Sequence, residues 1–349
     1  MQRFNRIVFF LAVLVFTGMF FISEMNLPAR MVPNPDSVKS VSAGVSAAPP
    51  VKIPKTGIQK LIGKSEESIV RSFGKPERTD PTEFGYQWLV YGRNTENYIQ
   101  IGIGQQSHRV ETVYALGRKL DTAPFLIGQP AAHFLKKEAA TVPLNEKGLM
   151  VNFELNADDL AARPLIRLKS GWAQLDIDRM TGRLQGVRYL NSAVLLLQRP
   201  YSLSYAGHLP SRPQISSKRQ TAVDRGEEKE IFDITNILRA RNHRETLTWD
   251  SRAAHAAYLH SREMKLRNYF SHDSKWSGDL KTRLEREGIL FQYAGENIAA
   301  RYTDAAAVTM GWLNSPDHRS NMLSPDFTQL GVGAFTNEYT QDFVSPMRP

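Results

Sequence analysis

Apolar residues in the C-terminal third of the chain recur at the spacing of amphipathic helices, and the last two apolar segments alternate with the period of strands. Asp250 is suited to cap one of these helices, and Gly288 is suited to end another. The expected helices are residues 228–242, 251–267, 279–287 and 304–314, and the expected strands are 330–335 and 339–344. Residues 227–349 therefore form a mixed helix and strand domain.

The segment 56–199 contains an apparent internal repeat. Leu61-Ile62-Gly63 precedes a helical pattern at 65–73, and Leu126-Ile127-Gly128 precedes a second one at 131–137. The alternating stretches 99–103 and 109–116 match 173–177 and 183–190 without a gap. We therefore expect a duplicated α+β domain, in which each unit packs one helix on an antiparallel meander and leaves the other sheet face polar.

The N-terminus has the order of an export signal. Arg3 and Arg6 precede an apolar run at 7–22, and no small-residue cleavage site follows it. Residues 1–25 are thus a signal peptide or, preferably, an uncleaved anchor that holds the protein to the membrane. Proline-rich residues 26–55 and 200–226 are expected to be linkers, the second of which would make the two globular domains separable.

The amino-acid composition excludes some kinds of site and favours some classes of partner. The chain has 349 residues and no cysteine, which excludes disulfides, thiol nucleophiles and cysteine-ligated metals. A net charge of +9 suits anionic partners. Because export places the chain outside the cytoplasm, a lipid or cell-wall polymer is the expected partner, and nucleic acid is not.

Three polar clusters in the C-terminal domain are expected at the ends of elements: 269–272, 294–299 and 312–323. Taken singly, each has an ordinary structural explanation. His272 can cap a helix, Glu296 can accept backbone amides in a loop, and His318 can cap a turn. His255 and His260 are expected on a helix surface or in hydrogen bonds between helices.

Taken together, the clusters resemble the CAP superfamily of cysteine-rich secretory proteins, antigen 5 and pathogenesis-related proteins, also called SCP domains. The resemblance covers about residues 227–344. It rests on Ala257…Met264, Tyr269-Phe270-Ser271-His272, Gly295-Glu296-Asn297-Ile298-Ala299, Trp312…Ser315-Pro316-Asp317-His318-Arg319-Ser320-Asn321-Met322-Leu323 and Gly331-Val332-Gly333. The whole chain also resembles exported bacterial CAP proteins that have a CAP-associated N-terminal domain, to which the repeat would correspond.

The resemblance implies an α-β-α sandwich with a central cleft. Many members line this cleft with two histidines and two acidic residues, and the matching positions here are His272, Glu296 and His318, with Asn297 beside them. The second acid belongs three residues after Trp312, where this chain has Ser315. This departure removes the acid that a two-carboxylate mechanism would need.

Two imidazoles and a carboxylate can bind a divalent metal such as zinc, and a bound metal can activate water. Here the three candidate ligands are expected on three separate loops. A serine hydrolase using Ser271 or Ser315 with His272 or His318 is a further alternative, but the chain has no Gly-x-Ser-x-Gly motif.

The favoured hypothesis is a membrane-anchored or secreted CAP protein of the bacterial cell envelope that binds a small molecule, lipid, cell-wall ligand or metal without turnover. A metal-dependent, peptidase-like hydrolase that uses His272, Glu296 and His318 is the first alternative. A structural envelope or spore-surface protein is the second.

Overall fold

The computed structural model describes residues 56–133, 135, 139–146 and 148–347. The expected signal or anchor segment and the first linker lie outside these residues. Within the described part of the chain, no helix is both long and apolar enough to cross a membrane.

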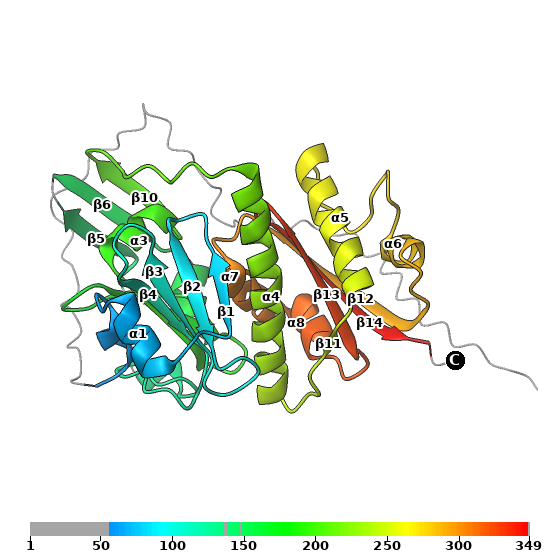
Figure 1. Ribbon diagram of the computed structural model, residues 1–349, viewed down its shortest axis with the longest axis horizontal. Coiled ribbons are helices and arrows are strands. Elements are labelled where there is room, and N and C mark those ends of the chain that lie inside the picture. The colour runs from blue at the N-terminus through cyan, green and yellow to red at the C-terminus, as the bar shows by residue number, and fades with distance from the viewer. Residues whose placement is uncertain (1–55, 134, 136–138, 147, 348–349) are drawn as a thin grey trace, which may run out of the picture.

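The N-terminal half is built around a seven-stranded sheet with the order β1-β2-β3-β4-β9-β8-β7, and a three-stranded sheet, β10-β6-β5, lies beside it (Figure 1). The strands are β1 (Arg78–Pro81), β2 (Tyr86–Tyr91), β3 (Ile99–Gly104), β4 (Val110–Ala115), β5 (Thr141–Glu146), β6 (Leu149–Glu154), β7 (Leu165–Arg167), β8 (Trp172–Asp178), β9 (Arg183–Leu190) and β10 (Ser202–Ala206). The helices are η1 (Ile58–Leu61), α1 (Glu66–Phe73), η2 (Ala131–His133), α2 (Ala157–Ala162) and α3 (Ser192–Gln198).

Both faces of the large sheet are buried. Ile69 of α1 packs with Ile101 and Val113 on one face. Trp88 and Tyr114 belong to the core on the other face. The expected polar, solvated face is therefore wrong, because the smaller sheet and α4 (Ser217–Arg241) cover it.

The two matching segments share some local geometry. The β3–β4 and β8–β9 hairpins each contain a bulge, near Gly102 and Asp176 respectively. Arg109 donates to the Gly63 carbonyl at 2.9 Å, and Arg183 donates to the Gly128 carbonyl at 2.7 Å. Their helices differ, because α1 has 8 residues whereas the described part of the second helical segment is a 3-residue 3-10 turn.

The C-terminal half is a three-layer sandwich around the sheet β11-β13-β14-β12, as Figure 1 shows. Helices α5 and α6 cover one face of this sheet, and α4, α7 and α8 lie on the other. The remaining elements are β11 (Thr248–Trp249), α5 (Ser251–Arg267), α6 (Leu280–Arg286), β12 (Phe291–Ala300), α7 (Ala305–Leu313), α8 (Pro316–Leu323), β13 (Gln329–Phe335) and β14 (Glu338–Pro346). The α-β-α architecture expected from the resemblance is present.

Helix α4 corrects the expected linker at 200–226. Residues 202–206 form β10, and α4 begins at Ser217 behind the N-cap Ser216. Residues 217–226 of α4 show little apolar periodicity, because Val223 is their one large apolar residue. Farther along the helix, Asp233 lies between the two halves with no exposed surface. The Asp233 carboxylate pairs with Arg78 at 2.8 Å and with Arg93 at 3.0 Å. Helix α4 thus joins the halves instead of separating them.

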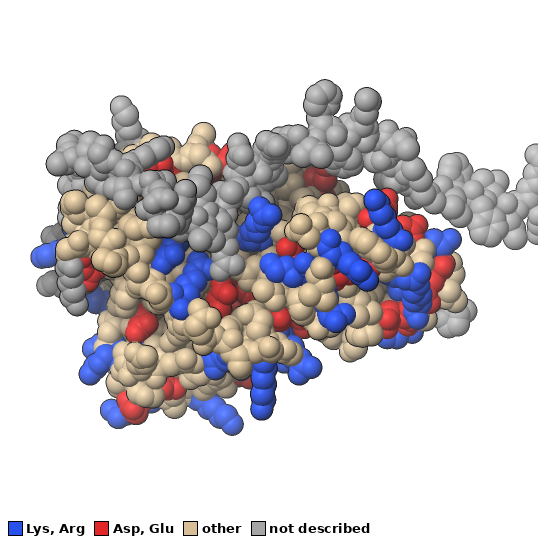
Figure 2. Space-filling model, turned by 90° about the horizontal axis from the view of Figure 1, so that it is seen from above, with Lys and Arg blue, Asp and Glu red and all other residues tan. Residues whose placement is uncertain are grey.

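The surface carries both signs of charge. On the face in Figure 2, Lys and Arg side chains lie among Asp and Glu side chains instead of forming one continuous basic band. The excess of positive charge is therefore spread over this face.

Candidate ligand-binding cleft

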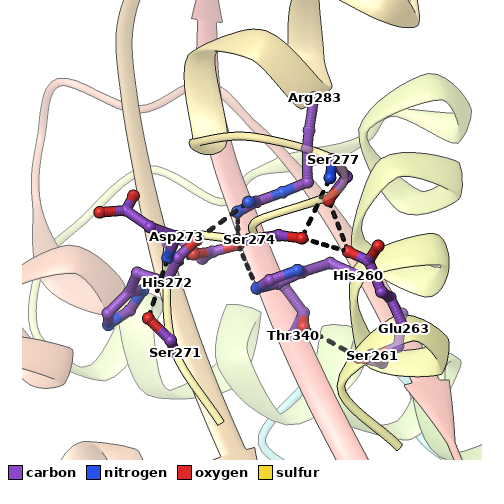
Figure 3. Close-up of polar contacts among 12 residues, drawn as sticks. His260, Ser261, Glu263, Ser271, His272, Asp273, Ser274, Ser277, Arg283 and Thr340 are labelled. Carbon is purple, nitrogen blue, oxygen red and sulfur yellow. Dashed lines mark hydrogen bonds and ion pairs between the residues drawn. The ribbon is translucent and has the colours of Figure 1, made fainter. Parts of the chain in front are cut away.

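The loop that carries His272 is fixed to α5. Glu263 Oε2 accepts hydrogen bonds from the hydroxyls of Tyr269 at 2.9 Å, Ser274 at 2.7 Å and Ser277 at 2.6 Å. Burial alone would raise the pKa of Glu263, but these donors hold it below its usual value. Figure 3 shows Ser274 and Ser277 directed toward Glu263. The three hydroxyls therefore order the loop around an ionised carboxylate.

Glu296 lies in the middle of β12, and not at the end of an element as expected. Its Oε1 is 2.8 Å from His272 Nδ1, and its Oε2 accepts from Arg283 Nη2 at 2.5 Å. Burial opposes the charge of this carboxylate, but the hydrogen bond from His272 and the charge of Arg283 keep the pKa of Glu296 below its usual value. An ionised carboxylate only accepts, so His272 Nδ1 is the donor, and Nε2 has no hydrogen bond to any described residue.

Two further ionisable groups lie beneath Glu296. His260 is fully buried on α5, with Nε2 3.8 Å from Glu296 Oε2, and burial lowers its pKa to about 4. Asp342 is the cross-strand partner of Glu296 on β14, and burial raises its pKa well above the usual value.

The expectation of a surface or hydrogen-bonded His260 is wrong, because neither ring nitrogen has a hydrogen-bond partner among the described residues. A signal for its burial exists in the sequence. Ala253, Ala257 and Met264 are buried on α5, and helical spacing puts His260 on the same stripe. Asp342 had no comparable signal, because its position opposite Glu296 depends on the register of β12 against β14.

His318 lies on α8, where its Nδ1 is 2.8 Å from Ser315 Oγ. Burial lowers the pKa of His318 to about 4, and the nearby His272 acts in the same direction. Asn297 donates to the His318 carbonyl at 3.1 Å and so ties α8 to β12. Trp312 is buried and donates to the Ile298 carbonyl at 3.1 Å, which fixes the end of α7 before Ser315.

The five predicted site residues therefore occupy one region, held by a loop, a strand and a helix. His272 and Glu296 are in direct contact, and so are Ser315 and His318. The expectation of three loops is wrong for Glu296 and His318. His272 is half-exposed, whereas Glu296 is almost completely buried. The accessible group of this site is therefore the imidazole of His272, with the carboxylate buried behind it.

The arrangement does not fit the expected metal shell. Within the described residues, no three His, Asp or Glu side chains form a group that can hold a metal ion. The guanidinium of Arg283 already occupies one oxygen of Glu296, and His272 occupies the other. A cation added there would face Arg283 at close range, which opposes binding.

A serine nucleophile is also poorly supported. Ser271 Oγ accepts from the Asp273 amide at 3.2 Å, and Ser315 is the serine that contacts an imidazole. That imidazole belongs to His318, whose pKa of about 4 makes it a weak general base at neutral pH.

Comparison with known proteins agrees with this architecture. Residues 62–201 match the family model for the CAP-associated N-terminal region, and residues 232–345 match the model for the cysteine-rich secretory protein family. Membrane protein YlbC of Bacillus subtilis (strain 168) is 35% identical over 347 residues, which is 99% of either chain. The chain belongs to the cysteine-rich secretory protein, or CAP, family.

Solved structures of CAP proteins show the same arrangement. An extracellular protein of Bacillus anthracis with an SCP domain superposes with a TM-score of 0.79 at 37% identity, over 86% of this chain and 99% of that one. A cysteine-rich secretory protein of Staphylococcus aureus gives a TM-score of 0.73 at 23% identity, over 84% and 95%. The second likeness bears on the fold alone. Each of the two structures superposes on more than four fifths of this chain, and so on parts of both its N-terminal and C-terminal halves.

Proposed function

We propose that this CAP protein is a non-catalytic binding module at the outer face of the bacterial cell membrane, and that its cleft binds a cell-wall or lipid-derived ligand through His272. The proposal is carried by the contacts of Glu296, because His272 binds one of its carboxylate oxygens and Arg283 binds the other. A carboxylate held in this way orients His272 but is not free to act as a base or a metal ligand. The half-exposed imidazole is then the group offered to a ligand.

The location rests on two kinds of support. The N-terminal apolar segment after Arg3 and Arg6 has the order of an export signal or anchor. The full-length relative of Bacillus subtilis is described as a membrane protein, and the Bacillus anthracis relative as extracellular. We infer the same side of the membrane for this chain.

We also infer that the N-terminal half arose by duplication. The two bulged hairpins and the equivalent bonds of Arg109 and Arg183 support this origin. The two units meet where β4 pairs with β9. One continuous sheet is therefore formed from both units.

The proposal is tested by co-sedimentation of the full chain with purified peptidoglycan sacculi and, separately, with anionic lipid vesicles. Replacing His272 and His318 together by asparagine should reduce binding to one of these at least roughly tenfold, the effect of losing a hydrogen bond to a charged or oriented group. His255→Asn is the matched control, because His255 pairs with Glu287 at 3.0 Å and is exposed on the outer side of α5.

Each outcome of this experiment has a meaning. Release of soluble fragments from sacculi by the parent, lost in the double variant, would overturn the non-catalytic proposal in favour of a hydrolase. Equal binding by parent and double variant would show that His272 and His318 do not bind peptidoglycan or anionic lipid. It would favour a structural envelope protein.

A further inference from the structure

A second concave site lies away from the cleft, between the two halves of the molecule. It is a cavity of about 120 Å³, walled on one side by α2, β8 and β9 and on the other by residues 302–314 around α7. Met310, Gly311 and Ala307 give the α7 side an apolar surface. Closed cavities of about 150 Å³ accommodate a benzene-sized molecule, so this cavity suits a ligand of about that size or slightly smaller.

Charged side chains of both signs line this cavity, and most of them are paired. Asp158 pairs with Arg179 at 2.8 Å, and Asp159 pairs with Arg163 at 2.9 Å. The remaining arginine of the wall, Arg188, is paired with Asp304 at 2.7 Å.

Asp176 is the exception among the carboxylates of the wall. Within the described residues it has no cation at ion-pair distance. The Tyr114 hydroxyl lies beside it next to Gly186, and this hydroxyl is itself buried without a hydrogen-bond partner among the described residues. Burial raises the pKa of Asp176 to about 6, and the charge of Arg188 opposes that rise. The carboxyl group is therefore mostly ionised at pH 7.5, and among the described residues it has no ion-pair partner of its own.

The hydroxyl-bearing side chain of Tyr302 lies on the opposite wall of the cavity. Tyr302 lines the cavity and packs against Gly311, where an added side-chain carbon would overlap the phenol ring. The glycine thus allows the tyrosine to approach α7.

We propose that this cavity binds a small primary ammonium compound with a short apolar substituent, with Asp176 as the counter-ion and Met310 against the apolar part. The ammonium group supplies the positive charge that Asp176 lacks, and three N–H donors can reach the carboxylate and neighbouring acceptors. The apolar part removes the surface of Ala307 and Met310 from water. This site is independent of the function proposed for the cleft.

The test uses isobutylamine as the probe and isobutanol as its uncharged analogue, with the full chain labelled at the methionine methyl groups with ¹³C. The signal of Met310 is assigned by its loss in Met310→Leu. At pH 7.5 the amine should shift this signal saturably, and Asp176→Asn should weaken the binding at least roughly tenfold, as expected for a hydrogen bond to a charged group. Asparagine has nearly the same size and shape as aspartate, so the packing around the site is maintained.

Asp158→Asn is the matched control, because Asp158 lies at the rim of the same cavity and is already paired with Arg179. It should bind the amine within about twofold of the parent, as surface ion pairs contribute little. A Met310 signal that does not move overturns the proposal. Equal affinity for isobutanol, or equal affinity of the Asp176→Asn variant, overturns it as well, because the negative charge would then play no part.

Discussion

At the residue scale, the cleft depends on pairing of buried charges. Glu296 is almost inaccessible, yet its ionised form is retained because a guanidinium and an imidazole contact its two oxygens. His260 lies below it without a hydrogen-bond partner among the described residues. A buried imidazole of this kind is held neutral, since the cost of burying its charged form exceeds the attraction of Glu296.

This state of His260 predicts a dependence of stability on pH. The pKa of His260 is about 4 in the folded protein, compared with about 6.5 for an unfolded histidine. As the pH falls between these values, the unfolded chain takes up a proton that the folded chain does not, so folding is destabilised. Replacement by leucine removes this contribution. From pH 7.5 to pH 4.5, the free energy of unfolding of His260→Leu should therefore improve relative to the parent by about 2–3 kcal/mol.

Urea denaturation of both proteins at the two pH values measures this difference. His255→Leu, on the exposed side of the same helix, should not show the improvement. A constant difference between His260→Leu and the parent would mean that His260 is charged or hydrated in the folded state.

At the scale of elements, α5 packs unusually close to β13. Side-chain carbons added at Gly331 or Gly333 would overlap the α5 backbone, at Ala253 and Ala254 for the first and at Ala257 and Tyr258 for the second. The Gly331-Val332-Gly333 motif therefore has a packing role, which allows the helix that carries His260 and Glu263 to lie directly on the sheet. Ser261 adds a fixed point by donating to the Gly333 carbonyl at 3.0 Å.

Gly333→Ala should accordingly destabilise the fold by about 1–3 kcal/mol, the usual cost of overpacking a close contact. The obstacle is backbone, which cannot rotate away as a flexible side chain can. Thermal or urea unfolding of the variant beside the parent measures the effect. An unchanged unfolding midpoint would show that α5 can move outward at no cost, and that the close contact does not restrain it.

At the scale of the whole molecule, the two halves share a hydrophobic core. Trp88 and Leu195 of the N-terminal half belong to the same buried cluster as Ile234 of α4 and Trp312 of α7. Ion pairs also cross between the halves, including those of Asp233 and the 3.0 Å pair of Arg319 with Asp178. The separability expected from a linker at 200–226 therefore does not apply to this structure.

Asp233→Asn tests this integration. It removes the charge that Arg78 and Arg93 share, whereas Arg78 keeps its pair with Asp80 at 2.6 Å. The weakened pairing of these partly buried guanidinium groups should cost about 1–3 kcal/mol. Asp158→Asn is the control at an exposed pair and should change stability by about 1 kcal/mol or less. Calorimetry should show a single transition for all three proteins, lowered in Asp233→Asn. Two transitions in the parent would contradict a shared core.

Several features were determined by the sequence alone, because they depend on neighbours along the chain. The bounds of α5, with Asp250 as its N-cap, follow from helical spacing and from a side chain that accepts the first amide groups. Helices α6 and α7 begin within one residue of the expected positions. The motifs around His272, Glu296 and His318 identified the family and the position of the missing acid at Ser315.

Tertiary structure decided the rest. Helix α4 begins at Ser217 behind the N-cap Ser216, and its first ten residues carry too few apolar side chains for periodicity to reveal them. Its position between the two halves depends on distant partners, such as Arg78 for Asp233. Arg283 and Asp342 reach Glu296 from α6 and β14, so their roles depend on how distant elements pack. The same holds for Asp176, whose surroundings come from both halves of the chain. Spacing along a sequence specifies which face of an element a residue occupies, whereas only the packed molecule specifies what that face meets.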